Sequence, residues 1–153
     1  MIVRDIYISR CDWTVRIYYA VTDYHTERII RDLQRIRCPY PIVLRVREKM
    51  AERNLDTGFT YSNTDRRDTV MVVGIHSSPA EFMNSLEHEL RHLIDDISLT
   101  MGIDRGGEAV AYITGDINAL ITEDIQLFVC DCDKHRKQIE RNLVKPKRRE
   151  SKY

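Results

Sequence analysis

No stretch of this sequence approaches the roughly 20 consecutive apolar residues that a membrane-spanning helix needs, and the chain carries no net charge. Its 24 lysines and arginines balance 24 aspartates and glutamates. The first absence argues against an integral membrane protein, and the second removes any overall electrostatic preference for nucleic acid or anionic lipid. A signal peptide is not expected either, because Arg4 and Asp5 interrupt the start of the chain before any apolar segment forms.

Cysteine is also scarce. The four cysteines are unevenly spaced and too few to indicate a disulfide framework, so we expect reduced thiols and a cytoplasmic protein. A chain of 153 residues, 42% hydrophobic and 31% charged, suits one globular domain with its own core. The end of the chain differs in composition, because it is strongly basic and has no clear apolar face. We therefore predict a domain over residues 1–133 and a flexible, solvated tail over residues 134–153, which is only weak evidence for nucleic-acid binding.

The order of the residue patterns predicts an α+β fold, a small twisted sheet with helices packed on it. Runs of β-branched and aromatic residues indicate strands, and apolar residues spaced by three and four indicate helices. The predicted strands cover residues 2–9, 13–21 and 70–75, and the predicted helices cover residues 23–38, 41–54, 78–101 and 107–128. Residues 60–69 are expected to form a polar loop between two extended segments.

The helix predicted over residues 78–101 carries the sequence His88-Glu89-Leu90-Arg91-His92, an H-E-x-x-H motif. Residues four apart lie one helical turn apart, so both imidazoles can reach a single metal ion from a rigid support. Zinc accepts imidazole nitrogens at about 2.0–2.1 Å and takes a third protein ligand in catalytic sites. Glu89 would then be placed to take a proton from water at the open position.

Glu108, at the start of the next predicted helix, is the candidate third ligand. Small residues follow it at Ala111, Gly115 and Ala119, and they would let two helices approach closely around a shared metal. Residues 102–107, if extended, are long enough to lead back to His92 at about 3.3 Å per residue. The alternative role for Glu108 is a favourable charge at a helix N-terminus.

The motif, followed sixteen residues after His92 by Glu108 within Glu108-Ala-Val-Ala-Tyr-Ile-Thr-Gly, resembles the gluzincin clan of zinc metallopeptidases. It is closest in style to minimal zincin domains of the phage or mobile-element type. The resemblance covers residues 70–120. It implies a zincin-like fold in which the motif helix faces a second helix, and zinc bound by His88, His92 and Glu108. It also implies Glu89 as general base, and a strand over residues 70–75 that pairs with an extended peptide or protein substrate.

The sequence departs from the thermolysin-like pattern one turn after Glu108. Those proteins place there an aspartate that orients the first histidine, whereas this chain has Tyr112. Tyr112 is a candidate to stabilise the oxyanion, with a packed tyrosine as the alternative, and Asp95, Asp96 and Asp116 are candidate partners of the histidines. The rival functional hypothesis is a non-catalytic zincin-like binding or regulatory module with a structural zinc site, because a fold does not establish a reaction.

Two further features carry weaker signals. His76 follows the last predicted strand and is either a contact to substrate or a loop residue without a role. Cys130, Cys132 and His135 form a C-x-C-x-x-H cluster that could hold a second metal, with Cys11 as a further candidate ligand. It lacks a clear fourth ligand, so free thiols near a helix end are the favoured interpretation.

Overall fold

A four-stranded mixed sheet forms the centre of the protein in the computed structural model, which describes residues 1–22, 25–52 and 58–143. The strand order is β1-β2-β4-β3; β2 and β4 are parallel, and the two outer pairs are antiparallel. The strands are β1 (Ile2–Ile8), β2 (Trp13–Tyr19), β3 (Gly58–Asn63) and β4 (Asp68–Val73). The helices are α1 (Thr26–Arg35), α2 (Tyr40–Ala51), α3 (Pro79–Met101), α4 (Glu108–Leu120), α5 (Thr122–Val129) and α6 (Asp133–Leu143).

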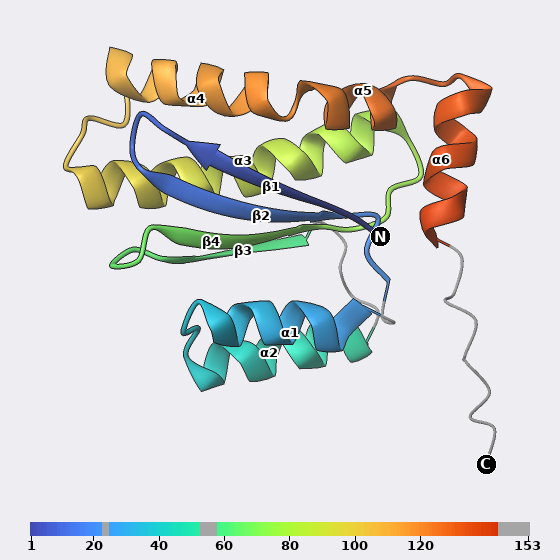
Figure 1. The fold of residues 1–153 in the computed structure, drawn as a ribbon, viewed down its shortest axis with the longest axis horizontal. Helices are drawn as coiled ribbons and strands as arrows, with labels where there is room; N and C mark the ends of the chain where they lie inside the picture. Colours follow the sequence, from blue (N-terminus) through green and yellow to red (C-terminus); the bar gives the residue numbers. More distant parts are fainter. Residues whose placement is uncertain (23–24, 53–57, 144–153) are drawn as a thin grey trace.

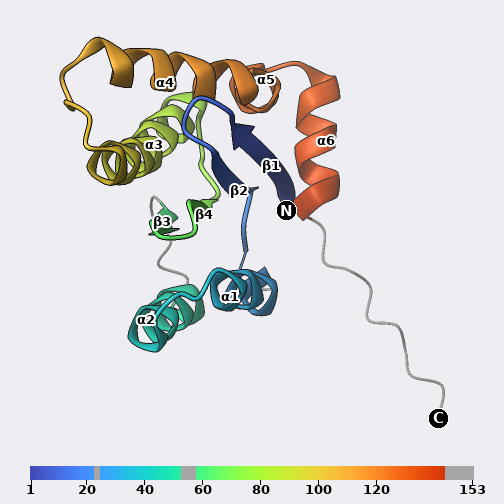
Figure 2. The ribbon, with the colours of Figure 1, turned by 60° about the vertical axis from the view of Figure 1, so that its left-hand side comes forward.

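Helices cover both faces of the sheet. Figures 1 and 2 show α1 and α2 on one face and α3, α4 and α5 on the other, while α6 lies at one end beside the N-terminus. The alternation of side chains along β2 supplies both layers. Trp13, Val15 and Ile17 join the core under α3 and α4, whereas Tyr18 points into the core under α1 and α2.

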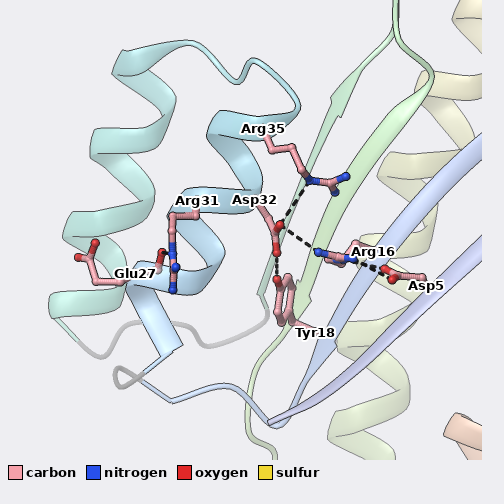
Figure 3. Close-up of polar contacts among 7 residues, drawn as sticks. All are labelled: Asp5, Arg16, Tyr18, Glu27, Arg31, Asp32 and Arg35. Carbon is pink, nitrogen blue, oxygen red and sulfur yellow. Dashed lines mark hydrogen bonds and ion pairs between the residues drawn. The ribbon is translucent and has the colours of Figure 1, made fainter.

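A polar network joins α1 to the sheet (Figure 3). The side chain of Asp32 is only 13% exposed. Its carboxylate accepts hydrogen bonds from the guanidinium of Arg16 at 3.0 Å and from the hydroxyl of Tyr18, and it pairs with Arg35 at 3.4 Å. Arg16 also pairs with Asp5 on β1 at 2.7 Å. Burial and the hydrogen bond to Asp32 raise the pKa of Tyr18 to about 12. The network fixes how α1 lies on the sheet without completing a catalytic arrangement.

The predicted α+β class is confirmed. The two N-terminal strands, the strand before α3 and the predicted helices that correspond to α1, α2 and α3 are also present in the structure. None of the helices within the described residues is long and apolar enough to cross a membrane.

Three predicted segments differ from the structure. Residues 58–63 form the edge strand β3, whereas residues 60–69 were expected to be a loop; Phe59 and Tyr61 pack on the core under α1 and α2. The helix predicted over 107–128 is divided at Ile121, which is fully buried. The division places α5 so that Arg4 binds the buried Asp124 at 2.7 Å.

The third difference concerns the predicted flexible tail. Its first part is helix α6, in which His135, Ile139 and Asn142 are partly buried at a spacing of three and four residues. The amino group of Met1 donates a hydrogen bond to the backbone carbonyl of Asn142, which holds this helix beside the start of β1. The first part of the predicted tail is therefore helical, and its remainder, residues 144–153, lies outside the described residues.

Candidate metal centre

Helix α3 carries the H-E-x-x-H motif, and local signals in the sequence fix its ends. The hydroxyl of Ser78 accepts a hydrogen bond from the backbone N–H of Glu81 at 3.2 Å, Pro79 occupies the first turn, and Gly102 ends the helix with a φ of 64°. An N-cap of this kind and a left-handed glycine are favoured helix termini. The apolar stripe of Phe82, Leu86, Leu90, Leu93 and Ile97 is buried against the sheet. This packing leaves His88 and His92 exposed on another side of the helix.

The two histidines converge. The Nε2 atoms of His88 and His92 lie 3.2 Å apart, and the planes of the two rings are nearly perpendicular, at 82°. Two nitrogens bound tetrahedrally to one zinc ion at about 2.0–2.1 Å would be about 3.3 Å apart. The pair therefore has the donor atoms and the spacing that two of the ligands of a zinc ion require.

Glu89 points to the adjacent, buried side of this part of α3. Its side chain is 2% exposed, and its Oε2 accepts a hydrogen bond from the hydroxyl of Thr60 on β3 at 2.7 Å. The same hydroxyl donates to the backbone carbonyl of Glu89 at 3.2 Å. Burial raises the pKa of Glu89, although the Thr60 hydrogen bond and the nearby imidazoles of His88 and His92 act in the other direction. The carboxylate is thus held between the edge strand and the two histidines.

The structure does not bring Glu108 to the histidine pair. Among the described residues, no third His, Cys, Asp or Glu has its ligand atom within 4.8 Å of both imidazoles. Helix α3 continues nine residues, or about 13 Å, past His92, and Figure 1 shows α4 starting beside the end of α3 and running back along it. Glu108 is therefore an exposed residue at the N-terminus of α4.

The link from α3 to α4 explains this position. We expected an extended path over residues 102–107, but the link closes into turns. The backbone N–H of Gly107 donates to the carbonyl of Asp104 at 3.1 Å, and the side chain of Asp104 accepts from the N–H of Gly106 at 3.1 Å. Arg105 also pairs with Asp95 on α3 at 3.8 Å. A link folded in this way spans too little distance to lead back to His92.

Tyr112 and the stripe of small residues lie on the outer side of α4. Tyr112 is 59% exposed, and the guanidinium of Arg10 lies over its ring, 5.4 Å from the centroid. A side chain added at Gly115 would meet nothing within 4 Å, so the small residues do not mediate a close helix contact, contrary to the prediction. The buried residues Val110, Ile113 and Ile117 pack α4 on the core instead. Tyr112 therefore lies on the surface of α4 beside Arg10 and is not packed between two helices.

The predicted partners of the histidines are mostly occupied by arginines. Asp95 pairs with Arg91 at 3.1 Å, and Asp116 pairs with Arg10 at 2.6 Å. Asp96 is partly buried on the side of α3 that approaches β3. The structure gives no orienting role to Asp95 or Asp116.

The edge of the sheet next to the motif is β3, not the strand predicted from residues 70–75. Strand β4 lies between β2 and β3 and pairs with both, so it has no free edge for a peptide substrate, and this expectation is wrong. Val70 to Val73 are fully buried, as a central strand requires. The sequence analysis did not identify Thr60 as a residue of the site. Phe59 and Tyr61, on either side of it, alternate with polar residues in the way that indicates a strand, with Thr60 on the other side of that strand.

The chain was compared with known proteins. No family model, no curated protein and no solved structure matches it. What supports a function is therefore the arrangement of the residues themselves, namely two converging imidazoles, one buried carboxylate and one adjacent sheet edge.

Proposed function

We propose that the protein is a zinc-dependent peptidase in which His88 and His92 bind the metal. The observation that carries the proposal is the 3.2 Å separation of the two Nε2 atoms on an exposed side of α3. Imidazole nitrogens at this spacing match the donor type and geometry of zinc. The resemblance of the motif to gluzincin peptidases supports the same metal, with Glu108 as the predicted third ligand.

Glu89 is the residue that we assign to proton transfer. A zinc ion at the histidine pair would supply Lewis acidity, polarising a peptide carbonyl and acidifying water. Glu89 would accept the proton of the attacking water and pass it to the leaving nitrogen. The hydroxyl of Thr60 holds one oxygen of Glu89 at 2.7 Å, so the carboxylate has a fixed orientation before substrate binds.

The edge strand β3 supports a peptide as the substrate. Within the described residues β3 pairs only with β4, which leaves its other edge available for an extended chain. A peptide added there would form main-chain hydrogen bonds whatever its sequence. Thr60 shows that β3 lies directly against the motif helix at Glu89, so a peptide bound along β3 would pass close to the two histidines.

The test separates metal binding from chemistry. We expect about one zinc ion at this site, lost in His88→Ala and in His92→Ala. Glu89→Gln should keep the zinc and lower cleavage of a mixed peptide library by on the order of 100-fold or more, because it keeps the shape and removes the base. The matched control is Glu87→Gln, which changes an exposed carboxylate on the same helix and should leave both properties unchanged.

The substitution Glu108→Gln tests whether Glu108 is the third zinc ligand. If Glu108 binds zinc, the link between α3 and α4 must rearrange when metal binds, and the substitution should weaken zinc affinity by about 10-fold or more. Unchanged affinity would remove Glu108 from the ligand set. Two neutral imidazoles can also share a hydrogen bond at 3.2 Å. Wild-type protein that never takes up zinc would thus contradict the proposal, and zinc binding without cleavage of any peptide would favour the non-catalytic module.

A further inference from the structure

A second group of metal-ligand side chains lies at the turn between α5 and α6. The sulfur atoms of Cys130 and Cys132 and a ring nitrogen of His135 all lie within 4.8 Å of one another. The local backbone explains their convergence. Cys130 is extended after the end of α5, and the N–H of Arg136 donates to the carbonyl of Cys132 at 3.1 Å, which starts α6. The first turn of α6 thereby places His135 beside the two thiols.

The Cys132 thiol interacts with the Cys130 thiol and with the backbone of Lys134 and His135, at the start of α6, whereas the ring of His135 keeps one unsatisfied nitrogen. Both thiols are free, and the Nδ1 atom of His135 is buried without a hydrogen-bond partner among the described residues. Buried ring nitrogens are normally hydrogen-bonded or bound to a metal. A metal ion bound through Nδ1 would satisfy this nitrogen.

The carboxylates interleaved with the group are engaged elsewhere. Asp131 pairs with Arg136 at 3.4 Å, and Asp133 pairs with the same guanidinium at 3.1 Å. The donors that remain are two sulfurs and one imidazole nitrogen. Thiolate and imidazole ligands favour zinc, whereas calcium and magnesium prefer oxygen.

We propose that Cys130, Cys132 and His135 form a zinc site that is separate from the histidine pair on α3. Zinc–sulfur bonds of about 2.3 Å and zinc–nitrogen bonds of about 2.0–2.1 Å place tetrahedral ligand atoms less than 4 Å apart. The ligand atoms of this group lie within 4.8 Å of one another, so side-chain rotation can bring them to the spacing that zinc requires. Two thiolates neutralise the charge of the ion. By joining the end of α5 to the first turn of α6, the metal would fix α6 against the domain.

The fourth coordination position would be close to a cavity. Cys130 lines a cavity of about 480 Å³ whose other walls include His76, Phe82 and Ile139. The Nε2 atom of His76 is buried and has no hydrogen-bond partner among the described residues. Three protein ligands leave the fourth position to water or to a small molecule in this cavity. The start of α3 lines the cavity, and His88 lies about 13 Å further along that helix, so the two metal sites are distinct.

Cobalt absorption tests the proposal, because only thiolate ligands give an intense sulfur-to-cobalt charge-transfer band in the near ultraviolet. The full chain, reduced and freed of metal, is titrated with Co²⁺ and then with Zn²⁺. We expect a thiolate band that saturates once one Co²⁺ per chain is bound at this site, and that disappears when Zn²⁺ is added. Cys130→Ser and His135→Ala should weaken Co²⁺ binding at this site by more than the roughly 10–100-fold cost of losing an outer-shell partner. The matched control is Gln138→Ala, an exposed residue of the same helix, which should keep the band.

The variant His88→Ala, His92→Ala separates this proposal from the proposed peptidase site. It should keep the thiolate band, and it should retain this zinc after losing the other. A second measurement needs no variant: Zn²⁺ should slow alkylation of Cys130 and Cys132, while the buried Cys11 and Cys38 serve as slowly reacting references. Reduced wild-type protein without a thiolate band, or thiols that react equally fast with and without Zn²⁺, would overturn the proposal.

Discussion

Replacing Thr60 by valine tests whether the edge strand holds Glu89 as an ionised carboxylate. Valine keeps the shape of threonine and removes the hydroxyl that donates to Glu89 Oε2 at 2.7 Å. A hydrogen bond to a charged group contributes about 1.5–3 kcal/mol to stability, and one between neutral groups about 0.5–1.5 kcal/mol. Since Glu89 is 2% exposed, water cannot replace the lost donor without a rearrangement. We expect Thr60→Val to lower the free energy of unfolding by about 1.5–3 kcal/mol at pH 7.

The same strand offers a control. Ser62 lies two residues along β3 on the same side and shares a neutral hydrogen bond with Thr69 at 2.9 Å, so Ser62→Ala should cost only about 0.5–1.5 kcal/mol. Urea unfolding of metal-free protein measures both changes. In a Glu89→Gln background the acceptor is neutral, so Thr60→Val should cost no more than Ser62→Ala. A cost for Thr60→Val that matches Ser62→Ala in the wild-type background, or that is unchanged by Glu89→Gln, would refute the reasoning.

Two further predictions concern the fold. A Cβ at Gly58, where φ is 133°, would lie 1.9 Å from the carbonyl oxygen of Val72, so Gly58→Ala should destabilise the protein by about 2 kcal/mol or more. Gly115→Ala, in open space on α4, should stabilise it by about 0.5–1 kcal/mol; urea unfolding of the two variants should give opposite signs. Tyr18 has a pKa raised to about 12, so its contribution to stability should be full below about pH 10 and lost as the pH rises toward 12. Tyr18→Phe should remove this part of the alkaline decline in unfolding experiments and cost about 1–3 kcal/mol at neutral pH by taking a donor from Asp32; an unchanged alkaline decline would contradict the assignment.

Much of the fold could be predicted because its signals are local. The β-branched and aromatic runs before residue 20 formed β1 and β2, and the apolar stripe from Phe82 to Ile97 formed α3. The convergence of His88 and His92 also follows from local geometry, because a spacing of four residues on any helix places two side chains one turn apart.

Other features were decided by contacts between distant segments. The sequence pattern of β4 is apolar throughout, and only the pairing with both β2 and β3 shows that it is central and that β3 is the edge beside the motif. The division between α4 and α5 depends on the packing of Ile121 and on the ion pair of Arg4 with Asp124. Such long-range contacts leave no periodic pattern in the sequence.

The candidate site also combines features set by the local sequence with features set by tertiary contacts. The sequence by itself determined the positions of the two imidazoles and of the carboxylate beside them on α3, because a helix of known period fixes their relative positions. Only the tertiary structure decided which side chain contacts Glu89, because Thr60 is 29 residues away along the chain. It also decided where Glu108 lies, since a link folded into turns spans less distance than the extended link that the spacing allows.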